Sequence, residues 1–299
     1  MKKLILHDID TIFISYDEPN ADKNYAELVK ILPWAKRIHG VKGSDAAHKA
    51  AAELSETDRL ITVDGDNIID KRFFEQDFYI PEGKDDCVFS WTGCNIINNL
   101  KYGNGGLKCW PKQYILDMKT HENSSSDDPK TRIEFCFDDK YVQIDTVYSM
   151  SYINASPLQA FRAGFREGVK MCLNEGEKWP VEDFKKNIHL PNYHRLLVWM
   201  NIGADVKNGL YAMYGARLGC WMTMLTDWDY VQVRDFEYIN QLWNTELEFG
   251  IEDNILKELE AKAKELREDL SIPVESFSPT QSEFFKEVYN STGRRPKKV

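Results

Sequence analysis

The sequence contains no apolar run long enough to cross a bilayer, no closely spaced cysteine pair and no internal repeat. The first absence excludes a membrane-spanning helix, and the start, residues 1–8, is interrupted by charge too early for a signal peptide. The six cysteines lie far apart, at positions 87, 94, 109, 136, 172 and 220. This spacing fits reduced thiols better than a zinc site or a disulfide framework. We therefore expect a cytoplasmic protein with no membrane partner, in the host cytoplasm if a phage encodes it.

Positive charge is in the minority, with 38 lysines and arginines against 48 acidic residues and a formal net charge of −10. This balance argues against a protein that coats nucleic acid without specificity. Positive residues nevertheless gather locally at 101–112, 162–170 and 294–298, so a basic strip on an acidic protein is compatible with the composition. With 299 residues, 42% of them hydrophobic, the chain can bury one large core or two smaller ones.

The first part of the chain alternates strand and helix patterns. Strands are expected at 11–16, 37–41 and 59–63, with helices at 21–32 and 46–54 between them. This alternation predicts an α/β fold with a mostly parallel sheet flanked by helices. Further strands are expected at 87–91 and 141–148, and a capping box at Ser156 starts a helix that runs through Met171. We expect a core at 1–150, a helical acceptor-side part of the same unit at 151–250, and a C-terminal helix with a basic tail at 251–299.

The most informative motif is Asp64-Gly65-Asp66-Asn67, which follows the apolar run 59–63. Open α/β sheets bind ligands at the carboxyl ends of their strands. Two acids on a short turn can hold a hard divalent cation and leave positions for water and phosphate oxygens. The alternative is an acidic turn without a ligand, since Asp-Gly is a common turn pair.

Two other segments are expected at the same edge of the sheet. The first strand, which contains Ser15, ends at Tyr16-Asp17-Glu18, where a nucleobase or ribose could lie. Residues 43–49 open a helix whose backbone amides favour anions, and His48 and Lys49 lie one turn further on. The alternatives are a solvated turn and ordinary surface residues.

The residues 42–53 and 60–67 together resemble the nucleotide half of GT-A fold (Rossmann-like) glycosyltransferases of the family-two type. Gly43 and Ala47 stand where that family has its glycine and alanine, and His48-Lys49 replaces its Arg-Asn. The resemblance implies a UDP-sugar donor and Mn²⁺ or Mg²⁺ on Asp64 and Asp66, with His189 or His194 eligible as a further ligand. The expected nucleotide-sugar residues are Ser15, Tyr16, Asp17, Gly43, His48, Lys49, Asp64, Arg162 and Arg166.

The second half is similar to tailed-phage glycosyltransferases through residues 102–111 and 156–170, most of all to those that arabinosylate hydroxymethylated cytosine. This resemblance implies double-stranded DNA containing 5-hydroxymethylcytosine as acceptor and a pentose or hexose donor. The glycines at 103–106 can bend tightly toward a ligand, and Trp110 could stack on it, although most tryptophans are core residues. The expected acceptor residues are Asn104, Gly105, Gly106, Lys108 and Trp110.

Arg162, Arg166 and Lys170 recur every four residues and so share one helix face. Such a row can hold a diphosphate or follow a DNA backbone; the alternative is a solvated basic face paired with Glu167. A transfer to a hydroxyl also needs a base. The candidates are Glu134, Asp138 and Asp139, with His121-Glu122 as a rival pair; the polar stretch 123–129 is either a lid or a surface excursion.

The leading hypothesis is therefore a metal-dependent glycosyltransferase that moves a sugar from a UDP-sugar to an acceptor hydroxyl. Two alternatives remain. A nucleotidyltransferase would release pyrophosphate instead of UDP, and a non-enzymatic phage accessory protein would bind DNA or carbohydrate without turnover.

Overall fold

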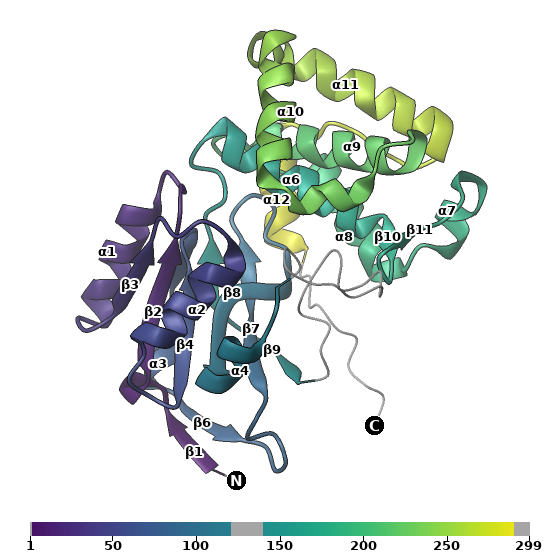
Figure 1. The fold of residues 1–299 in the computed structure, drawn as a ribbon. Coiled ribbons are helices and arrows are strands. Elements are labelled where there is room, and N and C mark those ends of the chain that lie inside the picture. The colour runs from purple at the N-terminus through teal and green to yellow at the C-terminus, as the bar shows by residue number, and fades with distance from the viewer. Residues whose placement is uncertain (1, 121–139, 290–299) are drawn as a thin grey trace.

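The computed structural model describes residues 2–120 and 140–289, and Figure 1 shows how their elements are arranged. A large sheet with flanking helices is formed by residues up to 151, and helices from the rest of the chain lie beyond one edge of it. Within the described residues, no helix is both long and apolar enough to cross a bilayer.

The large sheet has seven strands in the order β3-β2-β4-β8-β7-β9-β5. The strands are β2 (Asp10–Ser15), β3 (Lys36–His39), β4 (Arg59–Asp64), β5 (Asn67–Ile69), β7 (Val88–Asn95), β8 (Lys101–Pro111) and β9 (Tyr141–Ser151). β2 is parallel to β3 and β4, and β7 is parallel to β9. β8 is antiparallel to β4 and β7, and β5 is antiparallel to β9.

The expectation of a mostly parallel sheet is wrong, because three of the six strand pairings are antiparallel. The reason is the short connection between β7 and β8, which spans only residues 96–100. Parallel neighbours need a crossover of about a dozen residues or more, whereas a short connection returns the chain in the opposite direction. The observed class is a mixed α/β sheet flanked by helices.

The first half follows the predicted alternation of strands and helices. α1 (Ala21–Ile31) connects β2 to β3, and α2 (Ser44–Leu54) connects β3 to β4. Successive residues of β4 point to opposite faces of the sheet. Ile61 and Val63 pack with Leu28 of α1 on one face, and Leu60 packs with Ala51 of α2 on the other. β4 is therefore buried on both faces, as its continuous apolar run requires.

Smaller elements complete this part of the molecule. β1 and β6 pair in a two-stranded antiparallel sheet, and two short helices and a 3₁₀ turn pack beside the strands. They are β1 (Lys2–Ile5), η1 (Leu6–Asp8), α3 (Arg72–Glu75), β6 (Asp77–Ile80) and α4 (Lys112–Asp117).

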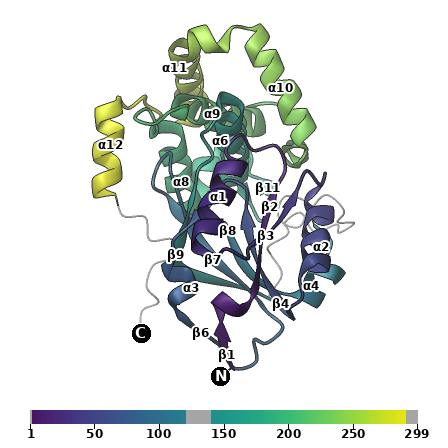
Figure 2. The same ribbon diagram turned by 90° about the vertical axis from the view of Figure 1, so that its left-hand side faces the viewer.

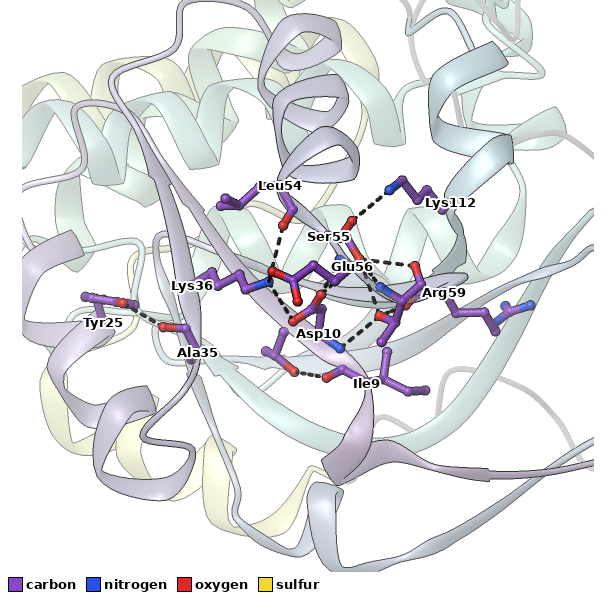
Figure 3. A network of polar contacts seen from close by, with 12 residues as sticks. Ile9, Asp10, Tyr25, Ala35, Lys36, Leu54, Ser55, Glu56, Arg59 and Lys112 are labelled. Atoms are coloured by element: carbon purple, nitrogen blue, oxygen red, sulfur yellow. Dashed lines mark hydrogen bonds and ion pairs between the residues drawn. The ribbon is translucent and has the colours of Figure 1, made fainter.

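A polar network fixes the edge of the sheet at which β2 and β4 begin (Figure 3). Lys36 Nζ lies 3.0 Å from Asp10 Oδ1 and donates to the Leu54 carbonyl at 3.3 Å. Lys112 Nζ donates to the Ser55 carbonyl at 2.7 Å. These contacts attach the C-terminal end of α2 to this edge, so its N-terminal end lies toward the opposite edge, where β4 ends.

The second half is mainly helical. Its elements are α6 (Pro157–Met171), β10 (Leu173–Asn174), β11 (Glu177–Lys178), α7 (Val181–Asn187), α8 (Leu190–Asn201), α9 (Gly209–Leu225), η2 (Tyr230–Arg234), α10 (Phe236–Glu248), α11 (Ile251–Leu270) and α12 (Pro279–Val288). α6 begins as predicted, with the Ser156 side chain accepting from the Gln159 amide and Pro157 in the first turn. In Figures 1 and 2, α9, α10 and α11 lie beyond the edge at which β2 ends.

α6 and α9 pack with their backbones in contact. A Cβ atom at Gly164 would lie 1.9 Å from the Ala212 carbonyl oxygen, and one at Gly168 would lie 2.3 Å from that of Ala216. Only glycine permits this approach. The close contact fixes α6, which carries Arg162 and Arg166, as a rigid element.

The described cysteines agree with the prediction of separate thiols. Cys87, Cys94, Cys109, Cys172 and Cys220 are free and buried. Cys136 lies outside the described residues.

Candidate functional site

The candidate site lies where β2 and β4 end. β4 brings Asp64 to this edge, and Gly65 and Asp66 form the turn into β5. Ile14 of β2 pairs with Asp64 in parallel register, so the residues that follow β2 lie beside the acidic turn. This is the edge at which open α/β sheets bind ligands.

The acidic turn is held from three directions. The Asn24 side chain of α1 donates to the Gly65 carbonyl at 3.0 Å, and the Tyr152 amide donates to the Asp66 carbonyl at 2.7 Å. The Asn67 side chain donates to Asp66 Oδ1 at 2.6 Å. The backbone of the turn is therefore fixed by residues from both halves of the chain, and the orientation of the Asp66 carboxylate is fixed with it.

A third carboxylate, Glu18, lies against this turn. Its Oε2 accepts from the Tyr16 amide at 2.8 Å, and a Cβ atom at Gly65 would lie 2.8 Å from the same oxygen. The sequence analysis placed Glu18 at the end of the first strand but did not include it among the expected nucleotide-sugar residues. The available signal was its position just after β2, the strand next to β4.

Two of the three carboxylates, Glu18 and Asp66, have raised pKa values. Burial raises the pKa of Asp66 to about 7, and the negative charges of Asp64 and Glu18 contribute in the same direction. Burial also raises the pKa of Glu18, followed by the charges of Asp17 and Asp64. Among the described residues, no lysine, arginine or histidine forms an ion pair with Glu18, Asp64 or Asp66. The edge thus concentrates negative charge without a protein counter-ion.

The acidic turn suits a hard divalent cation, which prefers carboxylate oxygens and would offset this charge. In residues 2–120 and 140–289, no three histidine, cysteine or acidic side chains converge in a geometry that could hold a metal ion. A cation here would accordingly be held by Asp64 and Asp66 together with oxygens from ligand or water. His189 and His194 are both exposed and do not join the acidic turn in such a group.

The glycines of β8 lie close to the acids. Gly106 has φ +72°, and a Cβ atom there would lie 2.4 Å from Asn67 Nδ2 and 2.9 Å from Asp64 Oδ2. Gly105 faces β7 instead, where its added Cβ would lie 2.1 Å from the Gly93 amide nitrogen. Gly106 therefore borders the site directly, and Gly105 positions the strand. Asn104 belongs to β8, but its side chain is outside the described part of the structure.

Trp110 is a core residue in this structure. Its side chain is fully buried and its indole Nε1 donates to Thr62 Oγ1 at 2.8 Å. A ring enclosed in this way has no face open for stacking on an acceptor, and we do not carry Trp110 forward as an acceptor-binding residue.

The start of α2 brings His48 near the acids. Gly43 precedes the helix with φ +95°, and His48 Nδ1 lies 2.8 Å from the Ser44 carbonyl oxygen. Because a carbonyl only accepts, Nδ1 carries the proton and donates. Burial lowers the pKa of His48, and the nearby charge of Asp64 opposes this effect. Lys49 lies in the same helix and forms an ion pair with Asp45 at 2.9 Å.

A second polar group lies at the ends of β2 and β3. The buried Ser15 Oγ accepts from Arg37 Nε at 3.0 Å and lies 3.0 Å from His39 Nδ1. Arg37 also donates to His39 Nδ1 at 3.1 Å, so that nitrogen is unprotonated and accepts. Tyr16, the next residue after β2, is 45% exposed. Arg37 and His39 were not expected at the site, because only the strand pairing places them beside Ser15.

The helical part contributes two arginines at the edge. Arg162 Nη1 lies 3.5 Å from Asp17 Oδ2, which places α6 near the end of β2. The guanidinium carbons of Arg162 and Arg166 each lie 4.9 Å from the centre of the Phe236 ring. The Nε atoms of both arginines are buried without a hydrogen-bond partner among the described residues.

The predicted basic row on α6 is not a solvated surface row. The side chains of Arg162 and Lys170 are only 15% and 20% exposed, and Lys170 Nζ lies 2.6 Å from Glu167 Oε1. The Glu167 pairing proposed as the alternative is thus present at Lys170, whereas Arg162 turns toward Asp17.

The candidates for the catalytic base cannot be placed in this geometry. Glu134, Asp138, Asp139, His121, Glu122 and the stretch 123–129 lie outside the described residues.

Taken together, fold and site define a mixed α/β protein with an acidic turn at the edge of the sheet where β2 and β4 end. No protein-family model matches the chain, and no curated protein matches it either. Among solved structures, the chain is similar to HddC from Yersinia pseudotuberculosis, with 17% identity and a TM-score of 0.28 over 48% of this chain and 74% of that one. A likeness at this TM-score carries no argument about this chain.

Proposed function

We propose that this protein is a metal-dependent glycosyltransferase that moves a sugar from a UDP-sugar to an acceptor hydroxyl. The observation that carries the proposal is the group of three carboxylates, Glu18, Asp64 and Asp66, at the carboxyl ends of two parallel strands. The pKa values of Glu18 and Asp66 are raised by burial and by neighbouring negative charge, and none of the three forms an ion pair among the described residues. Such a group is expensive unless a cation offsets it.

Asp64 and Asp66 are the proposed ligands of Mn²⁺ or Mg²⁺. When bound, the ion would supply Lewis-acid stabilisation of the departing diphosphate. The protein's part is to hold the two carboxylates in place, through the bonds from Asn24, Asn67 and the Tyr152 amide. Gly106 leaves room for this arrangement, because any side chain there would collide with Asp64 or Asn67.

The nucleotide is proposed to lie over the ends of β2 and β3. Tyr16 offers an exposed aromatic ring for a base, and the network around Ser15 offers polar groups for the base or ribose. Arg162 and Arg166 supply positive charge near this edge, where a diphosphate would accept their hydrogen bonds. Asp17 holds Arg162 toward the site.

For the acceptor, we propose the hydroxyl of 5-hydroxymethylcytosine in double-stranded DNA. The support is the resemblance of residues 102–111 and 156–170 to phage glycosyltransferases. A hydroxymethyl group is a weak nucleophile, so a carboxylate should remove its proton; Glu134, Asp138 and Asp139 are the proposed candidates. Reaching the base also requires access through the major groove or flipping it from the stack.

A transfer assay tests the proposal. Wild-type protein, Mn²⁺ and a panel of UDP-sugars are incubated with hydroxymethylcytosine DNA and with unmodified DNA, and DNA mass and released UDP are measured. We expect a mass gain of one sugar on the hydroxymethylated DNA only. Asp64→Asn and Asp66→Asn should each lose about a hundredfold or more in rate. The exposed Asp85→Asn serves as the matched control and should keep the wild-type rate.

The alternatives give different outcomes in the same assay. Release of pyrophosphate instead of UDP indicates a nucleotidyltransferase. Binding without consumption of any sugar nucleotide indicates a non-enzymatic protein. Full turnover by Asp66→Asn in the presence of a chelator would show that the acidic turn has no metal role.

A further inference from the structure

Lys108 is a buried lysine without a partner. It lies in β8 opposite Thr62 of β4 and Ser90 of β7, and it is only 5% exposed. Within residues 2–120 and 140–289, it forms no hydrogen bond and no ion pair. Its Nζ is not among the fully buried side-chain atoms of the described residues that lack a partner, so the ammonium group itself remains accessible to a ligand. A mostly buried lysine with a free, accessible ammonium group suits a negatively charged partner.

Lys108 lies in the candidate site. Its positive charge lowers the pKa of His48, while the negative charge of Asp64 raises it, so both groups are near the same imidazole. Lys108, Thr62 and Asp64 also share one face of the sheet, because Thr62 pairs with Lys108 and lies two residues before Asp64. Nevertheless, Lys108 and Asp64 do not approach within ion-pair distance. The carboxylates of the edge thus leave Lys108 without its counter-ion.

The strand order decides which part of a ligand would meet Lys108. Tyr16, Asp17 and Arg162 lie at the end of β2, on one side of β4. Lys108 lies on the other side, in β8. A nucleotide over β2 whose diphosphate is at the acidic turn would accordingly direct its distal end toward β8. That end carries the outer phosphate and the sugar.

We propose that Lys108 is an anion-binding residue that receives a negatively charged oxygen from the distal end of the bound nucleotide sugar. The inference rests on the proposed function, which supplies the nucleotide sugar. It assigns Lys108 to binding of the sugar-donor substrate, whereas the sequence analysis expected Lys108 to bind the acceptor substrate. Two sources share this chemistry, the outer phosphate of UDP and a carboxylate on the sugar. A DNA backbone does not fit, because a side chain that is 5% exposed is not accessible to a duplex surface.

Calorimetric titration tests the proposal by measuring the affinity of the protein for five ligands, each with Mn²⁺. The ligands are UMP, UDP, UDP-glucose, UDP-glucuronate and inorganic pyrophosphate. Lys108→Met keeps length and apolar bulk but removes the charge, and Lys108→Arg keeps the charge. Lys112→Met is the matched control in the next element, since Lys112 lies at the opposite edge and donates to the Ser55 carbonyl. Removal of an uncompensated buried charge should leave folding intact, and thermal unfolding of each variant checks this point.

The two sources give separate results. If Lys108 holds the outer phosphate, Lys108→Met should weaken the binding of UDP and UDP-glucose by about tenfold or more and leave the binding of UMP unchanged. If it holds a sugar carboxylate, Lys108→Met should weaken only UDP-glucuronate, by a similar factor. Lys108→Arg should restore most of the affinity in either case, and Lys112→Met should match wild type.

The inference is overturned if folded Lys108→Met binds every probe as wild type does. If wild-type protein binds no uridine nucleotide, the proposed function fails instead. Pyrophosphate then tests Lys108 by itself: equal binding by wild type and Lys108→Met overturns the anion site, and a tenfold loss supports it. Should Lys108→Met fail to fold, Lys108→Gln replaces it with the same expectations.

Discussion

At the scale of single residues, Asp66 shows what the folded structure adds to a motif. Its neighbours Asp64 and Asn67 were visible in the sequence, but its pKa of about 7 follows from burial and from the charges of Asp64 and Glu18. Glu18 reaches the turn only because β2 and β4 are adjacent and Gly65 has no side chain. Ligand binding at this turn should therefore depend on pH and on cations together.

In the presence of a chelator at about pH 8, Asp66→Asn should raise the free energy of unfolding by about 1–2 kcal/mol. This value is smaller than the full pKa shift of Asp66 would give, because Asp66 keeps some contact with solvent. The folded-state pKa of Asp66 lies above the ordinary value of 3.8. Ionisation of Asp66 in the wild-type protein therefore lowers the free energy of unfolding progressively as the pH rises from about 4 to about 7. Denaturant unfolding at several pH values measures the difference, which should vanish below about pH 4.

At about pH 8, Mn²⁺ should make the wild-type protein more stable than Asp66→Asn, because binding of the ion to the folded state stabilises that state. Wild type should then gain stability and Asp66→Asn should not. Equal stability of both proteins across the whole pH range would contradict the assigned crowding of carboxylates.

At the scale of elements, β8 determines how the acidic turn is enclosed. It runs antiparallel between β4 and β7, and its register places Gly106 beside Asp64. The left-handed backbone of Gly106 and its contact with Asn67 leave no space for a side chain. The geometry of the site therefore depends on a strand that the sequence analysis did not predict.

Gly106→Ala should destabilise the protein by about 2–3 kcal/mol and weaken Mn²⁺-dependent UDP binding by about tenfold, because the added Cβ displaces Asn67 and Asp64. Gly83→Ala is the matched control, since Gly83 has the same φ of +72° and nothing within 4 Å of an added Cβ. It should cost only about 1 kcal/mol from backbone strain and leave binding unchanged. Thermal unfolding and calorimetric titration measure both quantities. Equal effects of the two substitutions would show that backbone strain alone acts at Gly106.

At the scale of the whole molecule, the helical part completes the edge of the sheet. Asn20 donates to the Tyr152 carbonyl at 2.8 Å, Arg162 approaches Asp17, and Lys42 lies 3.5 Å from Glu237 of α10. These contacts bring α6 and α10 to the ends of β2 and α2 (Figure 2). The arginines of α6 thus enter the site only through the packing of the two halves.

Phe236→Ala should weaken UDP binding by about five- to thirtyfold, because the ring supports both Arg162 and Arg166 and each contact is worth about 0.5–1 kcal/mol. Phe249→Ala is the control, since Phe249 follows the same helix and is 79% exposed. Calorimetric titration with UDP and Mn²⁺ measures the affinities. If both variants bind UDP as wild type does, the arginine pair does not contact the nucleotide.

The sequence by itself determined β2, β3 and β4 with the two helices between them, and the position of Asp64 and Asp66. Strand and helix periodicities are local, and an apolar strand followed by Asp-Gly-Asp specifies both a buried β4 and the turn at its end. The helix start at Ser156 was equally local, since a capping box involves only a few neighbouring residues.

Only the tertiary structure decided the rest. It made β8 antiparallel, enclosed Trp110, joined Glu18 to the acidic turn, and gave the buried Lys108 no partner among the described residues. Each of these outcomes depends on which strands are neighbours and which side chains meet across them. Such contacts link residues far apart in the sequence, such as Thr62 and Trp110, which are 48 positions apart, and no local pattern of apolar and polar residues encodes them.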